Sequence, residues 1–199
     1  MIAIFDYGAG NLRSVENTLG ELGCAYEVVR DAAGLRRADK IILPGVGHFG
    51  QMMRALDTLQ VREVLKERIA AKIPFLGICL GLQGLYERSE EAPEERGLGV
   101  FPGSVRRFDA DARVPHMGWN ELEVKGASKL VRQLDAPPFV YFAHSYYVPE
   151  DERASAICCY GVRYTAVLES GNVYGVQFHP EKSGPVGLRI VRNFLELAC

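Results

Sequence analysis

The sequence has no long apolar run and no excess of charge of either sign. Its longest apolar stretch, residues 73–82, is too short to span a bilayer. Lysines and arginines number 23 against 25 aspartates and glutamates, which gives a formal net charge of −2. This balance gives no excess of positive charge of the kind that binds the phosphates of nucleic acids. We therefore expect neither a nucleic-acid nor a membrane partner.

The cysteines are few, and their spacing argues against a disulfide framework and against a zinc site. The five are Cys24, Cys79, Cys158, Cys159 and Cys199. No two of them have C-x-x-C spacing, so we predict free thiols in a reducing compartment and no bound metal. The N-terminus has no basic region, and Asp6 interrupts its apolar run, unlike a signal peptide. The sequence therefore predicts a cytoplasmic protein.

Strand-like and helix-like segments alternate in the first half of the chain. Short apolar segments predict strands at 2–5, 26–29, 41–43 and 75–78. Apolar residues at helical spacing predict helices at 12–22, 61–69 and 80–86, and a last helix from Pro185. Between about 105 and 178 the segments are short and rich in β-branched and aromatic residues, which favours strands, some antiparallel. We predict one α/β domain over residues 1–199, with a mostly parallel central sheet flanked by helices.

The stretch Phe75-Leu76-Gly77-Ile78-Cys79-Leu80-Gly81 carries the strongest chemical signal. An apolar strand leads into a cysteine that has a glycine two residues before it and another two residues after it. This is the pattern of a nucleophile on a sharp strand-to-helix turn, with sulfur in place of oxygen. The turn places the thiol at a helix N-terminus and directs the Leu80 N–H to the point where an oxyanion would develop. A buried structural cysteine is the alternative for this segment taken alone.

A matching base lies in Gln177-Phe178-His179-Pro180-Glu181. His179 follows a predicted strand, and Glu181 lies two residues further, which in extended structure puts both side chains on one side. A cysteine nucleophile needs a base, and the imidazole needs a third group that fixes its tautomer. Cys79, His179 and Glu181 supply these three roles. For the other histidines, His48, His116 and His144, a loop or hydrogen-bonding role is sufficient.

With these two segments in place, the sequence resembles the class I glutamine amidotransferases over essentially its whole length. The family's motifs appear as G-I-C-L-G at 77–81 and F-H-P-E at 178–181. Further stretches resemble the branch that serves histidine biosynthesis: D-Y-G-A-G-N-L at 6–12, L-P-G-V-G-H-F-G at 43–50, P-H-M-G-W-N at 115–120 and H-S-Y-Y-V at 144–148. The resemblance implies hydrolysis of glutamine through a cysteine thioester, with no cofactor.

The resemblance also implies further site residues. The second oxyanion donor would be the N–H of Val46, and glycines on both sides of Val46 predict that its orientation is adjustable. The expected substrate contacts are Gly47, Gln83, Glu91, Ser145 and Tyr146. Without the resemblance, Glu91 would be assigned to a solvated acidic loop.

The partner implied by the resemblance is a separate cyclase subunit with a (β/α)8 barrel, which receives the ammonia and forms a heterodimer with this chain. The positions expected near the ammonia exit and the interface are Asn11, Met117, Trp119, Tyr141 and Lys182. Trp119 is the only tryptophan of the chain. A core position in a β-meander is its alternative.

Three other functions remain open at this point. A glutaminase of another amidotransferase, such as the pyridoxal phosphate synthase type, would share the triad but lack the 43–50 and 115–120 motifs. A cysteine peptidase of similar fold would cleave peptides and ignore a cyclase. A non-catalytic binding module would have lost a triad residue, and all three are present.

Overall fold

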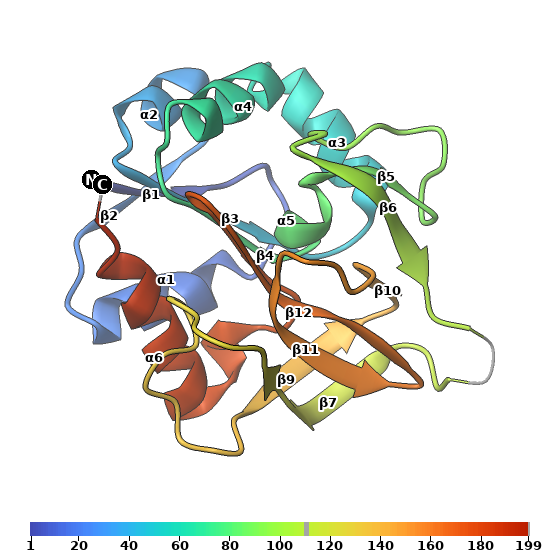
Figure 1. Ribbon diagram of the computed structural model, residues 1–199. Helices are drawn as coiled ribbons and strands as arrows, with labels where there is room; N and C mark the ends of the chain where they lie inside the picture. The colour runs from blue at the N-terminus through green and yellow to red at the C-terminus, as the bar shows by residue number, and fades with distance from the viewer. Residues whose placement is uncertain (110–111, 199) are drawn as a thin grey trace.

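The computed structural model describes residues 1–109 and 112–198 and is built on an eight-stranded sheet (Figure 1). The strands of this sheet, in spatial order, are β2 (Tyr26–Val29), β1 (Ile2–Phe5), β3 (Lys40–Gly45), β4 (Phe75–Cys79), β13 (Val173–Val176), β12 (Val162–Ser170), β11 (Ala154–Tyr160) and β8 (Glu123–Val124). The strands from β2 to β13 are parallel, and the remaining three are antiparallel. The predicted fold class is therefore confirmed.

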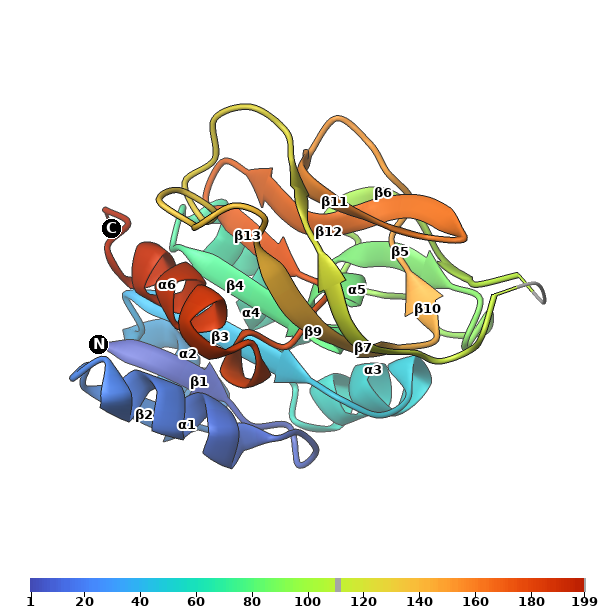
Figure 2. The same cartoon turned by 90° about the horizontal axis from the view of Figure 1, so that it is seen from below.

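Helices cover both faces of the sheet (Figures 1 and 2). One face packs against α2 (Ala32–Arg37), α3 (Phe49–Thr58) and α4 (Arg62–Ala70), and the other against α1 (Leu12–Glu21) and α6 (Gly184–Leu195). Along β1, Ala3 and Phe5 enter the first core and Ile4 enters the second. This alternation follows from the two-residue period of a strand, so a strand buried on both faces is apolar throughout.

Two smaller sheets lie beside the central one. One contains β10 (Tyr146–Tyr147), β6 (Phe101–Arg107) and β5 (Tyr86–Ser89), and the other pairs β7 (His116–Glu121) with β9 (Phe139–His144). The short helix α5 (Leu80–Gln83) follows β4 directly, and the 3₁₀ turn η1 (Pro180–Lys182) precedes α6. These elements supply the walls of the functional site.

Two element boundaries differ from the sequence prediction by more than one residue. Strand β3 runs through Pro44 to Gly45, whereas we expected it to end at Leu43. The register with β1 stops at Ile42, so the missing N–H of Pro44 breaks no ladder on that side. The helix predicted over 80–86 ends at Gln83, because the next residues bond to a returning segment: Val100 N donates to the carbonyl of Leu85 at 2.8 Å.

Cys24, Cys79, Cys158 and Cys159 are free thiols, and Cys199 lies outside the described residues. Among residues 1–109 and 112–198, no helix is both long and apolar enough to cross a membrane.

Candidate active site

Cys79 ends β4 at the carboxyl edge of the parallel strands, and α5 begins at the next residue. Its backbone has φ 54° and ψ −106°, a left-handed conformation that L-residues rarely adopt. Such a conformation costs about 1–3 kcal/mol and persists only where the surroundings impose it. The strain lifts the side chain out of the sheet, as the predicted nucleophile turn requires.

The flanking glycines are needed for space and not for backbone freedom. Neither Gly77 nor Gly81 has positive φ. A Cβ at Gly81 would lie 2.0 Å from the carbonyl oxygen of Leu43, and one at Gly77 would lie 2.5 Å from the carbonyl oxygen of Gly81. Helix α5 therefore packs backbone-to-backbone against β3 and β4, and the strained φ falls on the cysteine itself.

Gly81→Ala is expected to destabilise the fold by roughly 3 kcal/mol, since the new methyl group meets main-chain atoms that no rotamer change can move. Urea denaturation followed by circular dichroism measures the change. Gly20→Ala in α1 is the matched control: its Cβ meets no atom of the described residues within 4 Å, so the stability should rise slightly. A Gly81→Ala protein as stable as wild type would contradict the close-packing argument.

His179 and Glu181 form the predicted pair, although not in extended structure. Residues 180–182 form the 3₁₀ turn η1, which brings Glu181 Oε1 to 2.9 Å from His179 Nδ1. The side chains of both residues are almost fully buried. His179 and Cys79 line one cavity, and the sulfur is close enough to raise the pKa of the ring. Because Nδ1 is held by the carboxylate, Nε2 is the ring nitrogen available to the thiol.

The neighbours of His179 determine its charge. Burial by itself lowers the pKa of His179, but the hydrogen bonds and charges of Cys79 and Glu181 raise it to about 10. The raised pKa keeps the imidazole protonated at neutral pH, beside the sulfur of Cys79. The carboxylate stabilises this cation and fixes the orientation of the ring.

Gln177 is a contact that the sequence analysis missed. Its Nε2 donates to Cys79 Sγ at 3.6 Å, and its side chain is fully buried. Gln177 directly follows β13 and precedes His179 by two residues. A glutamine there nevertheless carries no chemistry of its own that marks it in a sequence.

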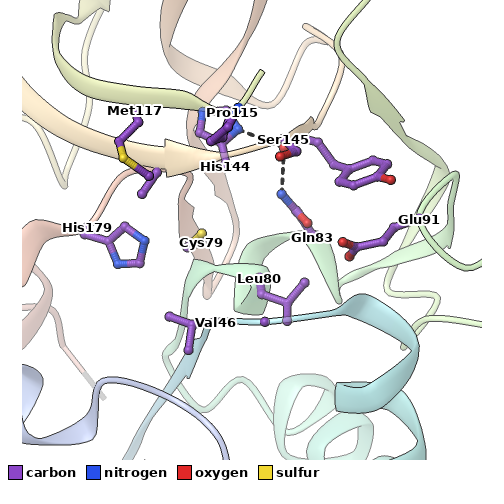
Figure 3. A pocket seen from close by; sticks show the side chains of 13 residues that line it. Val46, Cys79, Leu80, Gln83, Glu91, Pro115, Met117, His144, Ser145 and His179 are labelled. Atoms are coloured by element: carbon purple, nitrogen blue, oxygen red, sulfur yellow. Dashed lines mark hydrogen bonds between the residues drawn. The ribbon is translucent and has the colours of Figure 1, made fainter. Parts of the chain in front are cut away.

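A cavity of about 200 Å³ opens over Cys79 (Figure 3). The predicted site residues that line it are Val46, Gly47, Cys79, Leu80, Gln83, Glu91, Met117, Ser145, Tyr146 and His179. Figure 3 shows Cys79 between His179 on one side and Gln83 and Glu91 on the other. The cavity therefore has a reactive end at Cys79 and a recognition end at Glu91.

The two expected oxyanion donors differ in their surroundings. The Leu80 N–H is in the first turn of α5, where an amide has no partner within the helix. The Val46 N–H instead donates to the hydroxyl oxygen of Tyr7 at 3.2 Å, and that hydroxyl donates to the Val46 carbonyl, also at 3.2 Å. In this structure the Val46 N–H is therefore directed toward Tyr7.

Glu91 and Gln83 are oriented by the protein for ligand contact. Phe49 N donates to Glu91 Oε2 at 2.7 Å, which leaves Oε1 as the other carboxylate oxygen. Gln83 Nε2 donates to the Tyr146 carbonyl at 2.8 Å and to Gln177 Oε1 at 3.1 Å. A carboxylate at this end suits a ligand ammonium group, and Glu91 is half-buried, unlike the solvated charge that the sequence alone suggested.

Of the residues expected at a partner interface, Trp119, Tyr141 and Lys182 lie against one another, and Met117 is on the same strand as Trp119. Met117 and Trp119 on β7 are 64% and 57% exposed, so the core position considered for Trp119 is excluded. Tyr141 on β9 packs edge-on against Trp119, with ring centroids 6.2 Å apart, and Lys182 Nζ lies 5.9 Å from the centre of the Tyr141 ring. Asn11 stands at the start of α1, without a side-chain capping bond.

Comparison with known proteins identifies relatives over the whole chain. The family model "Glutamine amidotransferase class-I" matches residues 3–198. A protein of Bacillus thuringiensis strain Al Hakam named "Imidazole glycerol phosphate synthase subunit HisH" is 46% identical over 195 residues, which are 98% of this chain and 93% of the relative. The protein of the same name from Bacillus anthracis is 45% identical over the same shares.

Solved structures agree on the fold. One titled "Crystal structure of glutamine amidotransferase" has a TM-score of 0.75 at 22% identity and covers 98% of this chain and 97% of its own. The PurLQS structure from Thermotoga maritima has a TM-score of 0.76 at 20% identity, with 98% and 96% covered. Together with the match of the family model, these relatives show that the chain belongs to the class I glutamine amidotransferases.

Proposed function

We propose that this chain is the glutaminase subunit of imidazole glycerol phosphate synthase, with Cys79, His179 and Glu181 as its catalytic triad. It hydrolyses glutamine to glutamate and ammonia and passes the ammonia to a cyclase subunit in histidine biosynthesis. The observation that carries the catalytic assignment is the arrangement of three side chains. A strained cysteine and a buried histidine line the same cavity, and a buried carboxylate holds the histidine at 2.9 Å.

The reaction follows from this arrangement. The Cys79 sulfur attacks the side-chain amide carbon of glutamine, and negative charge moves to the carbonyl oxygen, where the Leu80 N–H meets it. His179 gives its proton to the departing nitrogen, so ammonia leaves and a thioester remains. His179 then accepts a proton from a water molecule that attacks the thioester. The C–S bond breaks, glutamate is released and the thiolate is restored.

Glutamine would be held at the recognition end of the cavity. Glu91 faces the α-ammonium group, and the backbone of Ser145 and Tyr146 faces the α-carboxylate. Gly47 leaves room beside the ligand, because a Cβ there would meet no atom of the described residues within 4 Å. Gln83 contacts the substrate next to the reacting amide. These contacts would select free glutamine, which carries both α-charges, over a glutamine residue within a peptide chain.

The partner would be a separate subunit with a (β/α)8 barrel that covers Met117 and Trp119. Exposed tryptophan and methionine are enriched in protein interfaces, and Asn11, Tyr141 and Lys182 would border the contact. We place the protein in the cytoplasm, where free thiols such as those of Cys24 and Cys158 are usual. Residues 1–199 would act as one domain.

The function is tested by measuring glutamate release from glutamine by the purified chain, alone and with the cyclase subunit and its nucleotide ligand. Strong stimulation by the liganded partner, absent in Cys79→Ala and retained in Cys24→Ala, is expected. High activity that ignores the partner would keep the triad but overturn the pathway. Absence of glutamine hydrolysis under every condition would favour a peptidase or a binding module.

Trp119→Ala is expected to weaken binding to the cyclase subunit by about 30-fold, since a central tryptophan in an interface commonly contributes about 2 kcal/mol. Isothermal titration calorimetry measures the affinity. Leu59→Ala, at the exposed C-cap of α3, is the control and should bind as wild type does. Equal affinity of the Trp119→Ala and wild-type chains would place the interface elsewhere.

A further inference from the structure

A buried series of hydrogen bonds connects β7 with the substrate cavity, and Tyr164 on β12 lies at its centre. The Tyr164 hydroxyl oxygen is 3.0 Å from His116 Nδ1 and 3.3 Å from His144 Nε2. His116 belongs to β7 and His144 ends β9, where the two are paired in register. Tyr164 is fully buried, and His116 and His144 are nearly so. Neither histidine is used in the catalytic steps above.

The donors and acceptors in this series follow from one carbonyl. His144 Nδ1 lies 2.8 Å from the Tyr146 carbonyl oxygen, which can only accept, so Nδ1 carries the hydrogen. Burial lowers the pKa of His144 to about 3, so the ring is neutral and Nε2 presents a lone pair. The Tyr164 hydroxyl must therefore donate to His144. Its oxygen then accepts from His116 Nδ1, and burial likewise lowers the pKa of His116, to about 4.

The far end of the series reaches the nucleophile. The Tyr146 carbonyl also accepts from Gln83 Nε2, whose second hydrogen goes to Gln177 Oε1. Both amide hydrogens of Gln83 are thus used, and its Oε1 is the atom left to face a ligand. Gln177 completes the path with its bond to Cys79 Sγ. Reversing the Gln83 amide would place two acceptor oxygens against each other at Tyr146, so this orientation is set by the network.

We propose that Tyr164 is a positioning residue for the substrate: its hydroxyl donates to Nε2 of His144 and holds that ring in place, so that Nδ1 keeps its hydrogen bond with the Tyr146 carbonyl, which in turn orients the Gln83 amide. This assignment rests on the proposed function in one respect, that the ligand is glutamine. The series begins on β7, the strand that exposes Met117 and Trp119. A partner that shifts β7 would therefore act on the substrate end of the cavity through His116 and Tyr164.

Tyr164→Phe tests the role of the hydroxyl with the ring retained. Without it, Nε2 of the buried His144 ring loses the Tyr164 donor, so the ring is held at Nδ1 alone and can turn away from the Tyr146 carbonyl. We expect KM for glutamine to rise about fivefold, the loss that one hydrogen bond of ordinary strength implies, with kcat nearly unchanged. Tyr174→Phe is the matched control, since Tyr174 is a buried tyrosine on the neighbouring strand β13 whose ring packs edge-on against Phe194. Equal KM values for Tyr164→Phe and the control would overturn the proposal.

Nitrogen-15 NMR of the histidine side chains gives a second readout that a merely structural role of Tyr164 would not move. In the wild-type chain, His144 and His116 are both expected as neutral rings with the hydrogen on Nδ1, and the Nε2 resonance of His144 should shift toward that of an unbonded ring nitrogen in Tyr164→Phe. A wild-type His144 with its hydrogen on Nε2 would overturn the proposal without any variant. The measurement needs no catalysis, so it stays decisive if the chain proves not to hydrolyse glutamine.

Discussion

Glutaminase kcat is expected to fall by about 10³- to 10⁴-fold when Glu181 is replaced by glutamine. Glu181 Oε1 accepts from His179 Nδ1, and an amide at that place can present its NH₂ group instead, which favours the wrong tautomer of the ring. The substitution also removes the charge that balances the imidazolium. Steady-state assays with the liganded partner measure the loss. A variant within tenfold of wild type would show that Glu181 does not orient the base.

The same substitution predicts a change in pH dependence. The pKa of His179 is about 10 in the folded chain and 6.5 for the unperturbed group, and Glu181 is one cause of the rise. A raised pKa contributes stability fully below pH 6.5, and this contribution is lost as the pH rises through 10. Glu181→Gln should therefore lower the pKa of His179 in an NMR titration. The difference in unfolding free energy between wild type and Glu181→Gln should be largest below pH 6.5 and should shrink as the pH approaches 10. Glu63→Gln, at an exposed ion pair with Lys66, is the control and should leave both unchanged.

The fold could be predicted because the relevant signals are local. Four segments in the first half became parallel strands. Three of them, β1, β3 and β4, are buried on both faces and are therefore mostly apolar, whereas β2 is an edge strand with Glu27 exposed. The local structure could not be predicted where residues distant in the sequence determine it. Tyr86 opens a strand and not a helical turn, because β5 pairs with β6 in register from Phe101. No pattern within residues 80–86 contains that information.

The site was predictable where chemistry needs an uncommon residue in a fixed local context. Cys79 lies between glycines, and His179 precedes a proline and a glutamate, so both could be read from the chain. Gln177 and Tyr7 could not, because they act through positions that only the folded sheet brings together. The exposure of Trp119 also depends on which face of the β7–β9 pair is covered, and this was open until the structure was known.

Partner-free glutaminase activity is expected to rise about tenfold in Tyr7→Phe, with KM little changed. One oxyanion donor is worth roughly 10²- to 10³-fold in kcat, and the Val46 N–H is at present given to the Tyr7 hydroxyl. Burial raises the pKa of Tyr7 to about 12, so the hydroxyl stays protonated and also donates to the Val46 carbonyl. Removal of the hydroxyl therefore frees both the N–H and the carbonyl of Val46. The gain stays below the full value of a donor because the freed peptide spends only part of its time directed into the cavity.

Gly47 allows the neighbouring Val46 peptide to turn. Its φ is 95°, a conformation that residues with a side chain rarely adopt. Tyr26→Phe is the matched control, since its hydroxyl bonds to Glu16 on the surface, away from the cavity. If the cyclase activates the chain by turning Val46, stimulation by the liganded partner should be smaller in Tyr7→Phe than in wild type. In the variant, Val46 has already lost its hydrogen bonds to the Tyr7 hydroxyl. A fall in partner-free activity would mean the opposite, that Tyr7 holds Val46 in the orientation that catalysis uses.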